Sequence, residues 1–214
     1  MGPLTCTGAI LAGGEASRFG GGPKGLERVG GVRIIDRVAL ALAQQTDDLL
    51  LVANDPDAGA WLPGVRTVAD IHTGRGSLGG IHAALVRAGT PVMVVAWDMP
   101  FVPTFLLREL RRLGESGHDV AIAESGSRRG VEPLCAWYAP SCVPAIERAL
   151  AAGRGEVISF FGDVRVARMP ADEVAAHGDP ARMFMNVNSP DELALAERYA
   201  STPDAGHRRP ETPR

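Results

Sequence analysis

The sequence predicts a single α/β domain with a mostly parallel central sheet and helices on both faces. Short apolar strands alternate with amphipathic helices through the first half of the chain, which is the pattern of a parallel sheet with crossover helices. The segment 92–96 is apolar at every position and is therefore expected to be a central strand. A length of 214 residues suits one hydrophobic core of this kind.

The first half supplies the elements that define this pattern. Gly13 follows the first apolar run and ends it, while Ile34, Val38 and Leu42 recur at helical spacing. The expected strands are residues 4–11, 49–53, 65–69 and 92–96. The expected helices are residues 33–45, 77–87 and 103–113.

The second half is expected to complete the sheet and to end in a helix. Ser189 is expected to cap that helix, with Glu192 at its third position as in a capping box. The expected strands are residues 120–123, 134–138, 164–169 and 184–187, and the expected helices are residues 140–150 and 190–199. We expect the domain to cover residues 1–200 and the polar residues 201–214 to be a disordered tail.

Composition argues against several classes of partner and site. The formal charge is −3 and the pI is about 6.0, without a basic stripe, so neither nucleic acid nor a membrane surface is an expected partner. No apolar run approaches the roughly 18 residues that would span a bilayer. Cys6, Cys135 and Cys142 form no Cys-x-x-Cys pair and predict reduced thiols in a cytoplasmic protein.

A glycine-rich loop follows the first expected strand and contains two cationic residues, Arg18 and Lys24. Glycines let backbone amides approach a phosphate closely, and the two cations suit a triphosphate. The alternative is a flexible surface loop, but the position directly after the first strand favours phosphate binding. The Gly-x-Gly-x-x-Gly match at 20–25 begins too far beyond the strand to indicate a dinucleotide site.

Polar residues also follow the later strands of the first half. Asp98 comes just past strand 92–96, Asn54 follows strand 49–53 and Asp70 follows strand 65–69. Ligands of parallel sheets bind beyond the carboxyl ends of the strands, where a carboxylate is well placed to hold Mg²⁺ against phosphate oxygens. The alternative for each of the three is a turn residue without a ligand.

Two asparagines, Asn186 and Asn188, precede the last helix. Alternation places both amides on one side of an extended segment, where they suit a metal or a substrate contact. A helix-capping turn is the alternative. The arginine pair at 128–129 is interpreted as part of a solvated face.

A set of short motifs follows a particular order along the chain. They are Leu-Ala-Gly-Gly at 11–14 with Arg-Phe-Gly-Gly at 18–21 and Lys-Gly-Leu at 24–26, Gly-Ser-Leu-Gly-Gly at 76–80, Asp-Met-Pro-Phe at 98–101, Glu-Pro-Leu at 132–134 and Asn-Val-Asn-Ser-Pro at 186–190. Each motif is weak alone. The ordered set spans nearly the whole chain and resembles the molybdenum cofactor guanylyltransferases, which are MobA-like nucleotidyltransferases.

The resemblance implies a Rossmann-like fold that binds GTP and Mg²⁺. Lys24, Asp98 and Arg18 would be the catalytic residues, with Asp98 as the Mg²⁺ ligand, and Asn186 and Asn188 would face the acceptor. The nucleotide contacts implied by position are Leu11, Ala12, Gly13, Gly14, Lys24, Asn54, Asp70 and Asp98. The chain departs from the family pattern at Phe19, Pro23, Ser77 and Trp97.

The activity implied by the resemblance is transfer of GMP from GTP to the phosphate of molybdopterin, with release of pyrophosphate, in molybdenum cofactor biosynthesis. The implied partners are GTP, a molybdopterin-type acceptor and, in transient contact, molybdenum cofactor proteins. A phosphate monoester has a second pKa of about 6 and carries close to two negative charges near neutral pH, so it needs no general base. Catalysis would then consist of positioning and charge neutralisation.

Two other functions stay open at this point. A cytidylyltransferase, or another nucleotidyltransferase with a different phosphate acceptor, would use the same chemistry. The cytidylyl sibling usually carries Ala-Ala-Gly where this chain has Ala12, Gly13 and Gly14. The extra glycine of this chain favours guanine as the base. A non-catalytic nucleotide-binding module is the second alternative, and the presence of both Lys24 and Asp98 argues against it.

Overall fold

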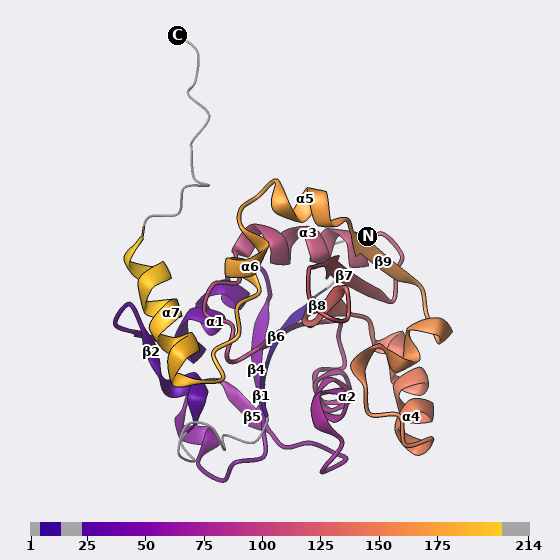
Figure 1. Cartoon of the computed structure of the whole chain (residues 1–214). Helices are drawn as coiled ribbons and strands as arrows, with labels where there is room; N and C mark the ends of the chain where they lie inside the picture. The colour runs from indigo at the N-terminus through magenta and orange to yellow at the C-terminus, as the bar shows by residue number, and fades with distance from the viewer. Residues whose placement is uncertain (1–4, 14–22, 203–214) are drawn as a thin grey trace.

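A seven-stranded sheet forms the centre of the molecule, in the order β5-β4-β1-β6-β8-β7-β9 (Figure 1). The computed structural model describes residues 5–13 and 23–202. The strands are β1 (Thr7–Ala12), β4 (Asp48–Ala53), β5 (Arg66–Val68), β6 (Val92–Ala96), β7 (Val120–Glu124), β8 (Val131–Tyr138) and β9 (Val166–Met169). The helices are α1 (Ile34–Ala43), α2 (Gly76–Ala88), α3 (Thr104–Glu115), α4 (Val143–Ala151), α5 (Ala171–Ala175), α6 (Pro180–Met183) and α7 (Pro190–Ser201).

The sheet is mostly parallel, as the strand–helix alternation predicts. Strand β1 lies between β4 and β6 and is parallel to both, and β4 is parallel to β5. Strand β8 reverses direction, because it pairs antiparallel with both β6 and β7. Strand β7 is in turn parallel to β9 at the far edge. The predicted fold class is therefore confirmed.

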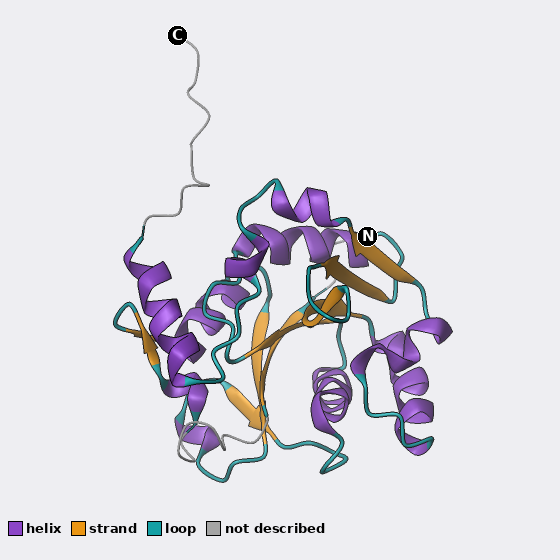
Figure 2. Ribbon diagram, viewed as in Figure 1, coloured by secondary structure: helices purple, strands orange, loops and turns teal. Residues whose placement is uncertain are grey.

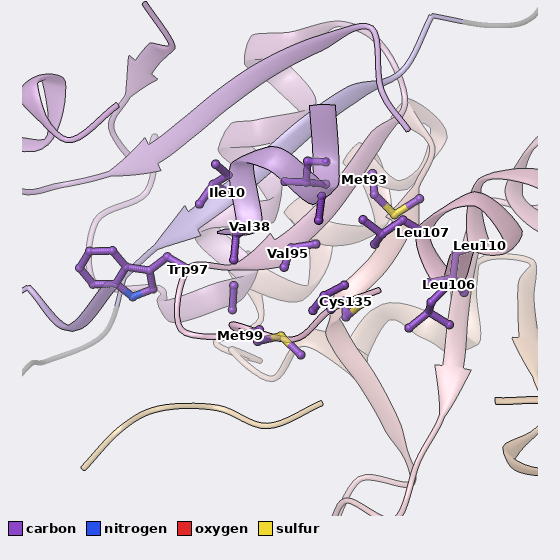
Figure 3. Packing of buried hydrophobic residues seen from close by; sticks show 14 of the residues in the cluster. Ile10, Val38, Met93, Val95, Trp97, Met99, Leu106, Leu107, Leu110 and Cys135 are labelled. Carbon is purple, nitrogen blue, oxygen red and sulfur yellow. The ribbon is translucent and has the colours of Figure 1, made fainter. Parts of the chain in front are cut away.

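Helices cover both faces of this sheet (Figures 1 and 2). Alternate residues of β1 separate to the two faces: Ile10 packs in the cluster that contains α1 and α3, and Ala9 packs in the cluster that contains α2 and α4. Figure 3 shows Ile10 and Val95 of the sheet with Val38 of α1 in the first cluster. Strands buried on both faces explain why the sequence shows continuous apolar runs there.

The expected strand at residues 184–187 is wrong. Phe184 lies in the turn that ends α6, and the segment forms no ladder among the described residues. Its Val187 N–H donates to the Asp98 carbonyl at 2.9 Å, and Met185 and Val187 pack in a small third cluster with Val29, Ile34 and Ala196. The apolar pattern therefore records packing beneath α7 and not pairing within the sheet.

A short hairpin lies between Lys24 and helix α1, where the sequence analysis predicts no strand. Strands β2 (Arg28–Val29) and β3 (Val32–Arg33) pair antiparallel, and Gly30 and Gly31 connect them with φ values of 58° and 77°. Two consecutive positive φ angles favour glycine and are typical of tight hairpin turns. The glycine pair was the sequence signal for this hairpin.

The predicted cap of the last helix is confirmed in part. Ser189 Oγ accepts a hydrogen bond from the Glu192 N–H at 3.3 Å. The Glu192 carboxylate accepts from the Asn188 N–H at 2.7 Å, one residue before the position that a capping box uses. Helix α7 ends at Ser201, and residues 203–214 of the predicted tail lie outside the described residues.

The three cysteines are free and buried, as expected for structural thiols. Burial raises the pKa of Cys6 to about 11 and that of Cys142 to about 12. Burial also raises the pKa of Cys135. The thiols therefore stay protonated at neutral pH and are inert packing groups. None of the helices in residues 5–13 and 23–202 combines the length and the apolar character needed to cross a membrane.

Asp119 ties the antiparallel half of the sheet together. Its buried carboxylate accepts hydrogen bonds from Ser141 Oγ at 2.6 Å and from the Arg165 N–H at 2.9 Å. The Arg165 guanidinium also contacts it, with Nε 3.0 Å from Oδ2. These donors, chiefly the Arg165 side chain, hold the pKa of Asp119 well below its ordinary value.

We expect Asp119→Asn to lower the free energy of unfolding at pH 7 by about 1–3 kcal/mol, because an amide cannot accept all these bonds. The carboxylate's folded pKa lies below its ordinary value of 3.8, so its contribution is present above that pH and is lost as pH falls. Urea unfolding at pH 7 and near pH 3 checks this. The surface variant Asp163→Asn is the control, and an equal loss at both pH values would contradict the prediction.

Candidate functional site

A cleft of about 950 Å³ opens at the edge of the sheet where β1, β4, β5 and β6 end. Parallel strands share this edge, so the loops after four separate strands meet there. The predicted residues that line the cleft are Leu11, Ala12, Gly13, Lys24, Asn54, Asp70, Asp98, Asn186 and Asn188. Gly14 and Arg18 lie outside the described residues.

The floor of the cleft is a junction of three side chains from distant parts of the chain. The Lys24 ammonium donates to Asp98 Oδ2 and to Asn188 Oδ1, both at 2.5 Å. The Lys24 and Asp98 side chains are only 11% and 8% exposed. Charges with so little solvent are stable only when they are paired and hydrogen-bonded. The junction therefore fixes where positive and negative charge lie in the cleft.

The second carboxylate oxygen of Asp98 has no partner in this junction. Asp98 Oδ1 is buried and forms no hydrogen bond with the described residues. An unsatisfied buried carboxylate oxygen is a hard ligand of the kind that Mg²⁺ prefers. One carboxylate, completed by phosphate oxygens and water, is the usual protein contribution to such a site. The residues present therefore fit a divalent cation at Asp98.

Trp97 supports the junction from behind. Its indole stacks on that of Trp61, with ring centroids 5.0 Å apart. The backbone N–H of Trp97 donates to the Leu11 carbonyl at 3.1 Å. A Cβ atom added at Gly25 would lie 2.3 Å from Trp97 Cε3, so the backbone next to Lys24 rests directly on the indole. Packing on the indole therefore positions the Lys24 backbone relative to the end of β6.

Asn54 and Asp70 hold each other at the ends of the two outer strands. Asn54 Nδ2 donates to Asp70 Oδ2 at 2.8 Å, and the Asp70 N–H donates to Asn54 Oδ1 at 2.9 Å. The closed pair links β4 to the loop after β5. Asp70 Oδ1 faces the start of α2, 3.7 Å from where a Cβ atom of Gly80 would stand. Absence of a side chain at Gly80 keeps this end of the cleft open.

Two further walls contain residues that the sequence analysis does not name as contacts. The N-terminal part of α2 contributes Gly76, Ser77 and Gly80, and the positive end of this helix dipole favours an anion. The opposite wall contains Arg129 from the β7–β8 loop and Glu132 from β8. Arg129 is exposed, as its interpretation as part of a solvated face predicts, and folding of the loop also brings it to the cleft.

Asn186 and Asn188 both line the cleft but have different surroundings. Asn188 is part of the junction at the floor, where its Oδ1 atom accepts a hydrogen bond from the Lys24 ammonium. Asn186 Nδ2 donates to the Phe184 carbonyl at 3.0 Å, which orients the amide from within its own segment. The extended segment thus places two amides on the cleft side, as alternation predicts.

Comparison with known proteins assigns the chain to a family. Residues 8–166 match the model of the MobA-like NTP transferase domain. A molybdenum cofactor guanylyltransferase of Desulfosudis oleivorans is 37% identical over 193 residues, which cover 89% of this chain and 94% of that protein. The crystal structure of molybdopterin-guanine dinucleotide biosynthesis protein A from Archaeoglobus fulgidus is similar with a TM-score of 0.77 and 31% identity, covering 91% of this chain and 98% of that chain.

A more distant structure shares the fold alone. A Mycobacterium tuberculosis protein crystallised with manganese is 18% identical and has a TM-score of 0.64, covering 91% of this chain and 98% of that chain. The similarity of both structures extends over nearly the whole chain. The fold of the described residues is therefore that of nucleotidyltransferases.

We expect Gly25→Ala to weaken binding of nucleotide and Mg²⁺ at least tenfold, because a methyl group at 2.3 Å from the indole must displace Trp97 or the Lys24 backbone. The free energy of unfolding should fall by about 1–3 kcal/mol. Thermal melts with and without GTP and Mg²⁺ measure both effects. Gly59→Ala is the matched control, since nothing lies within 4 Å of its added Cβ. Unchanged nucleotide binding in Gly25→Ala would refute the positioning role of Trp97.

Proposed function

The chain belongs to the MobA-like NTP transferase family, and we propose that it transfers GMP from GTP to the phosphate of molybdopterin, with release of pyrophosphate. The single observation that carries the proposal is the junction of Lys24, Asp98 and Asn188 at the floor of the cleft. It brings a cation, a carboxylate and an amide from three motifs to one point. The names of the guanylyltransferase relatives support GTP and the pterin as the substrates.

The cleft suits a phosphate-to-phosphate transfer. The acceptor phosphate oxygen attacks the α-phosphorus of GTP, the bond from that phosphorus to the oxygen bridging to the β-phosphate breaks, and pyrophosphate leaves. Near neutral pH the attacking phosphate monoester is largely deprotonated, so no side chain has to remove a proton. The residues of the chain therefore act by positioning the two substrates and by neutralising charge.

Lys24 is the residue best placed to neutralise charge in this transfer. Its ammonium lies at the floor between Asp98 and Asn188, where it would meet phosphate oxygens as they enter. We propose Asp98 as the Mg²⁺ ligand, and bound Mg²⁺ would supply positive charge that orients phosphate oxygens and stabilises the leaving pyrophosphate. Arg18 is proposed to add a further positive charge on the leaving group.

The nucleotide is proposed to lie over the parallel half of the sheet. Leu11, Ala12, Gly13 and Gly14 would contact it through the backbone, and the Asn54–Asp70 pair would hold the nucleoside end. The acceptor would lie toward Asn186 and Asn188. The reduced thiols suit a cytosolic enzyme, and transient contact with molybdenum cofactor proteins would deliver or receive the pterin.

We expect GTP with Mg²⁺ to stabilise the protein by about 2.7 kcal/mol at a hundredfold excess over its Kd, because a ligand of the folded state alone shifts the unfolding equilibrium. Thermal melts with GTP, CTP, ATP and UTP test this choice of nucleotide. A shift with CTP alone would instead indicate a cytidylyltransferase. A shift without release of pyrophosphate in the presence of the acceptor would favour the non-catalytic nucleotide-binding module, and no shift with any nucleotide would contradict nucleotide binding itself.

We expect Asp98→Asn to lower kcat for GMP transfer by about 10²–10³-fold, because an isosteric amide removes the charge at the proposed metal site. Lys24→Arg should lower it as well, since a planar guanidinium does not fit where a compact ammonium meets two oxygens at 2.5 Å. Pyrophosphate release measures both. Asp172→Asn, exposed on α5, is the control. Full activity of Asp98→Asn would sink the assignment.

A further inference from the structure

We propose that Arg129 binds the phosphate monoester of the acceptor and so aligns it for attack on the nucleotide. This inference rests on the proposed function and deepens it by naming the residue that recognises the acceptor's charged group. It follows from the division of the cleft, the charges in each half and the construction of the β7–β8 loop.

The order of the strands divides the cleft into two halves. Strands β5, β4 and β1 end on one side of β6, and β8 and β7 lie on the other. Asn54 and Asp70 belong to the first half. The second half is built by the start of β8, which extends beyond the end of β6. Strand β8 pairs with β7 from Val131 onward, but it pairs with β6 only from Cys135 onward.

Two cations, Lys24 and Arg129, line the cleft in the described part of the chain. Lys24 at the floor is bound to Asp98 and Asn188. Arg129 is exposed in the second half, and it forms neither a hydrogen bond nor an ion pair with residues 5–13 or 23–202. A cation that no acid of the chain has neutralised is available to an anionic ligand.

Glu132, an acid on the same wall, already accepts a hydrogen bond. Ser125 Oγ donates to Glu132 Oε1 at 2.6 Å, which orients that carboxylate toward the base of the loop. The loop itself is closed by its own bonds: the Gly130 N–H donates to the Ser127 carbonyl at 2.8 Å, and Ser127 Oγ donates to the Val131 carbonyl at 3.1 Å. Arg129 therefore projects from a turn with a defined shape.

The chemistry of the reaction calls for a cation at this place. Two phosphate groups must approach each other although both are negatively charged, and the described residues that we propose as nucleotide contacts lie at the floor or in the first half. A guanidinium binds a phosphate through two parallel N–H donors and stays protonated at every physiological pH. Arg129 would thus neutralise the incoming phosphate monoester and fix its direction.

The test compares Arg129→Gln with Arg128→Gln, since Arg128 is the adjacent exposed arginine and does not line the cleft. In Arg129→Gln the KM for molybdopterin should rise about tenfold to a hundredfold, the loss typical of a charged hydrogen bond. The KM for GTP and the thermal shift with GTP should change less than about twofold, and inorganic phosphate should compete less well with the acceptor. Arg129→Lys should recover part of the acceptor affinity, because it restores the charge without the paired donors.

Three results would overturn the inference. A rise in the KM for GTP would indicate that Arg129 contacts the nucleotide. Equal effects of Arg129→Gln and Arg128→Gln would indicate that the loop acts only through its overall positive charge. An unchanged KM for molybdopterin would show that Arg129 does not contact the acceptor. Failure of the unaltered chain to transfer GMP to molybdopterin would instead overturn the proposed function, and the inference with it.

Discussion

The buried contact between the Lys24 ammonium and the Asp98 carboxylate is the constraint on which the site depends. Lys24 is the single lysine among 22 cationic residues, the others being arginine. Its compact ammonium meets two oxygens at 2.5 Å in a space with little solvent. Because a buried charge must be paired, the segments around residues 24, 98 and 188 must converge whenever the domain is folded. Stability of the fold and geometry of the site therefore share the same contact.

The reversal of β8 gives this junction a second wall. A purely parallel sheet would place every strand end on one edge and only strand beginnings opposite them. Antiparallel β8 instead starts at the edge where β6 ends, so its first residues and the β7–β8 loop face the nucleotide half. One sheet thus builds both halves of the cleft, with Asp98 at the boundary between the parallel and antiparallel parts.

The sequence predicted most of this arrangement because parallel strands leave a simple signal. The run 92–96 matches β6, and the polar residues Asn54, Asp70 and Asp98 after successive strands do meet in one cleft. One failure and one omission have physical causes. Met185 and Val187 are apolar because they pack in one cluster with Ala196 of α7, and an apolar pattern alone does not reveal whether a partner strand exists. Arg129 is exposed as predicted, but its place at the cleft depends on the folded β7–β8 turn, which contacts such as Ser125 with Glu132 stabilise and which the sequence alone does not reveal.

Trp97 shows how a departure from the family pattern is accommodated. The family usually has a small residue before the metal-binding aspartate, and an indole there would be expected to narrow the cleft. The indole is instead only 4% exposed, because it stacks on Trp61 and lies against the backbone of Gly25. The three residues fit only together: the missing side chain at Gly25 makes room for the indole, and the indole supports Lys24. The indole therefore changes the packing beneath the junction and does not fill the cleft above it.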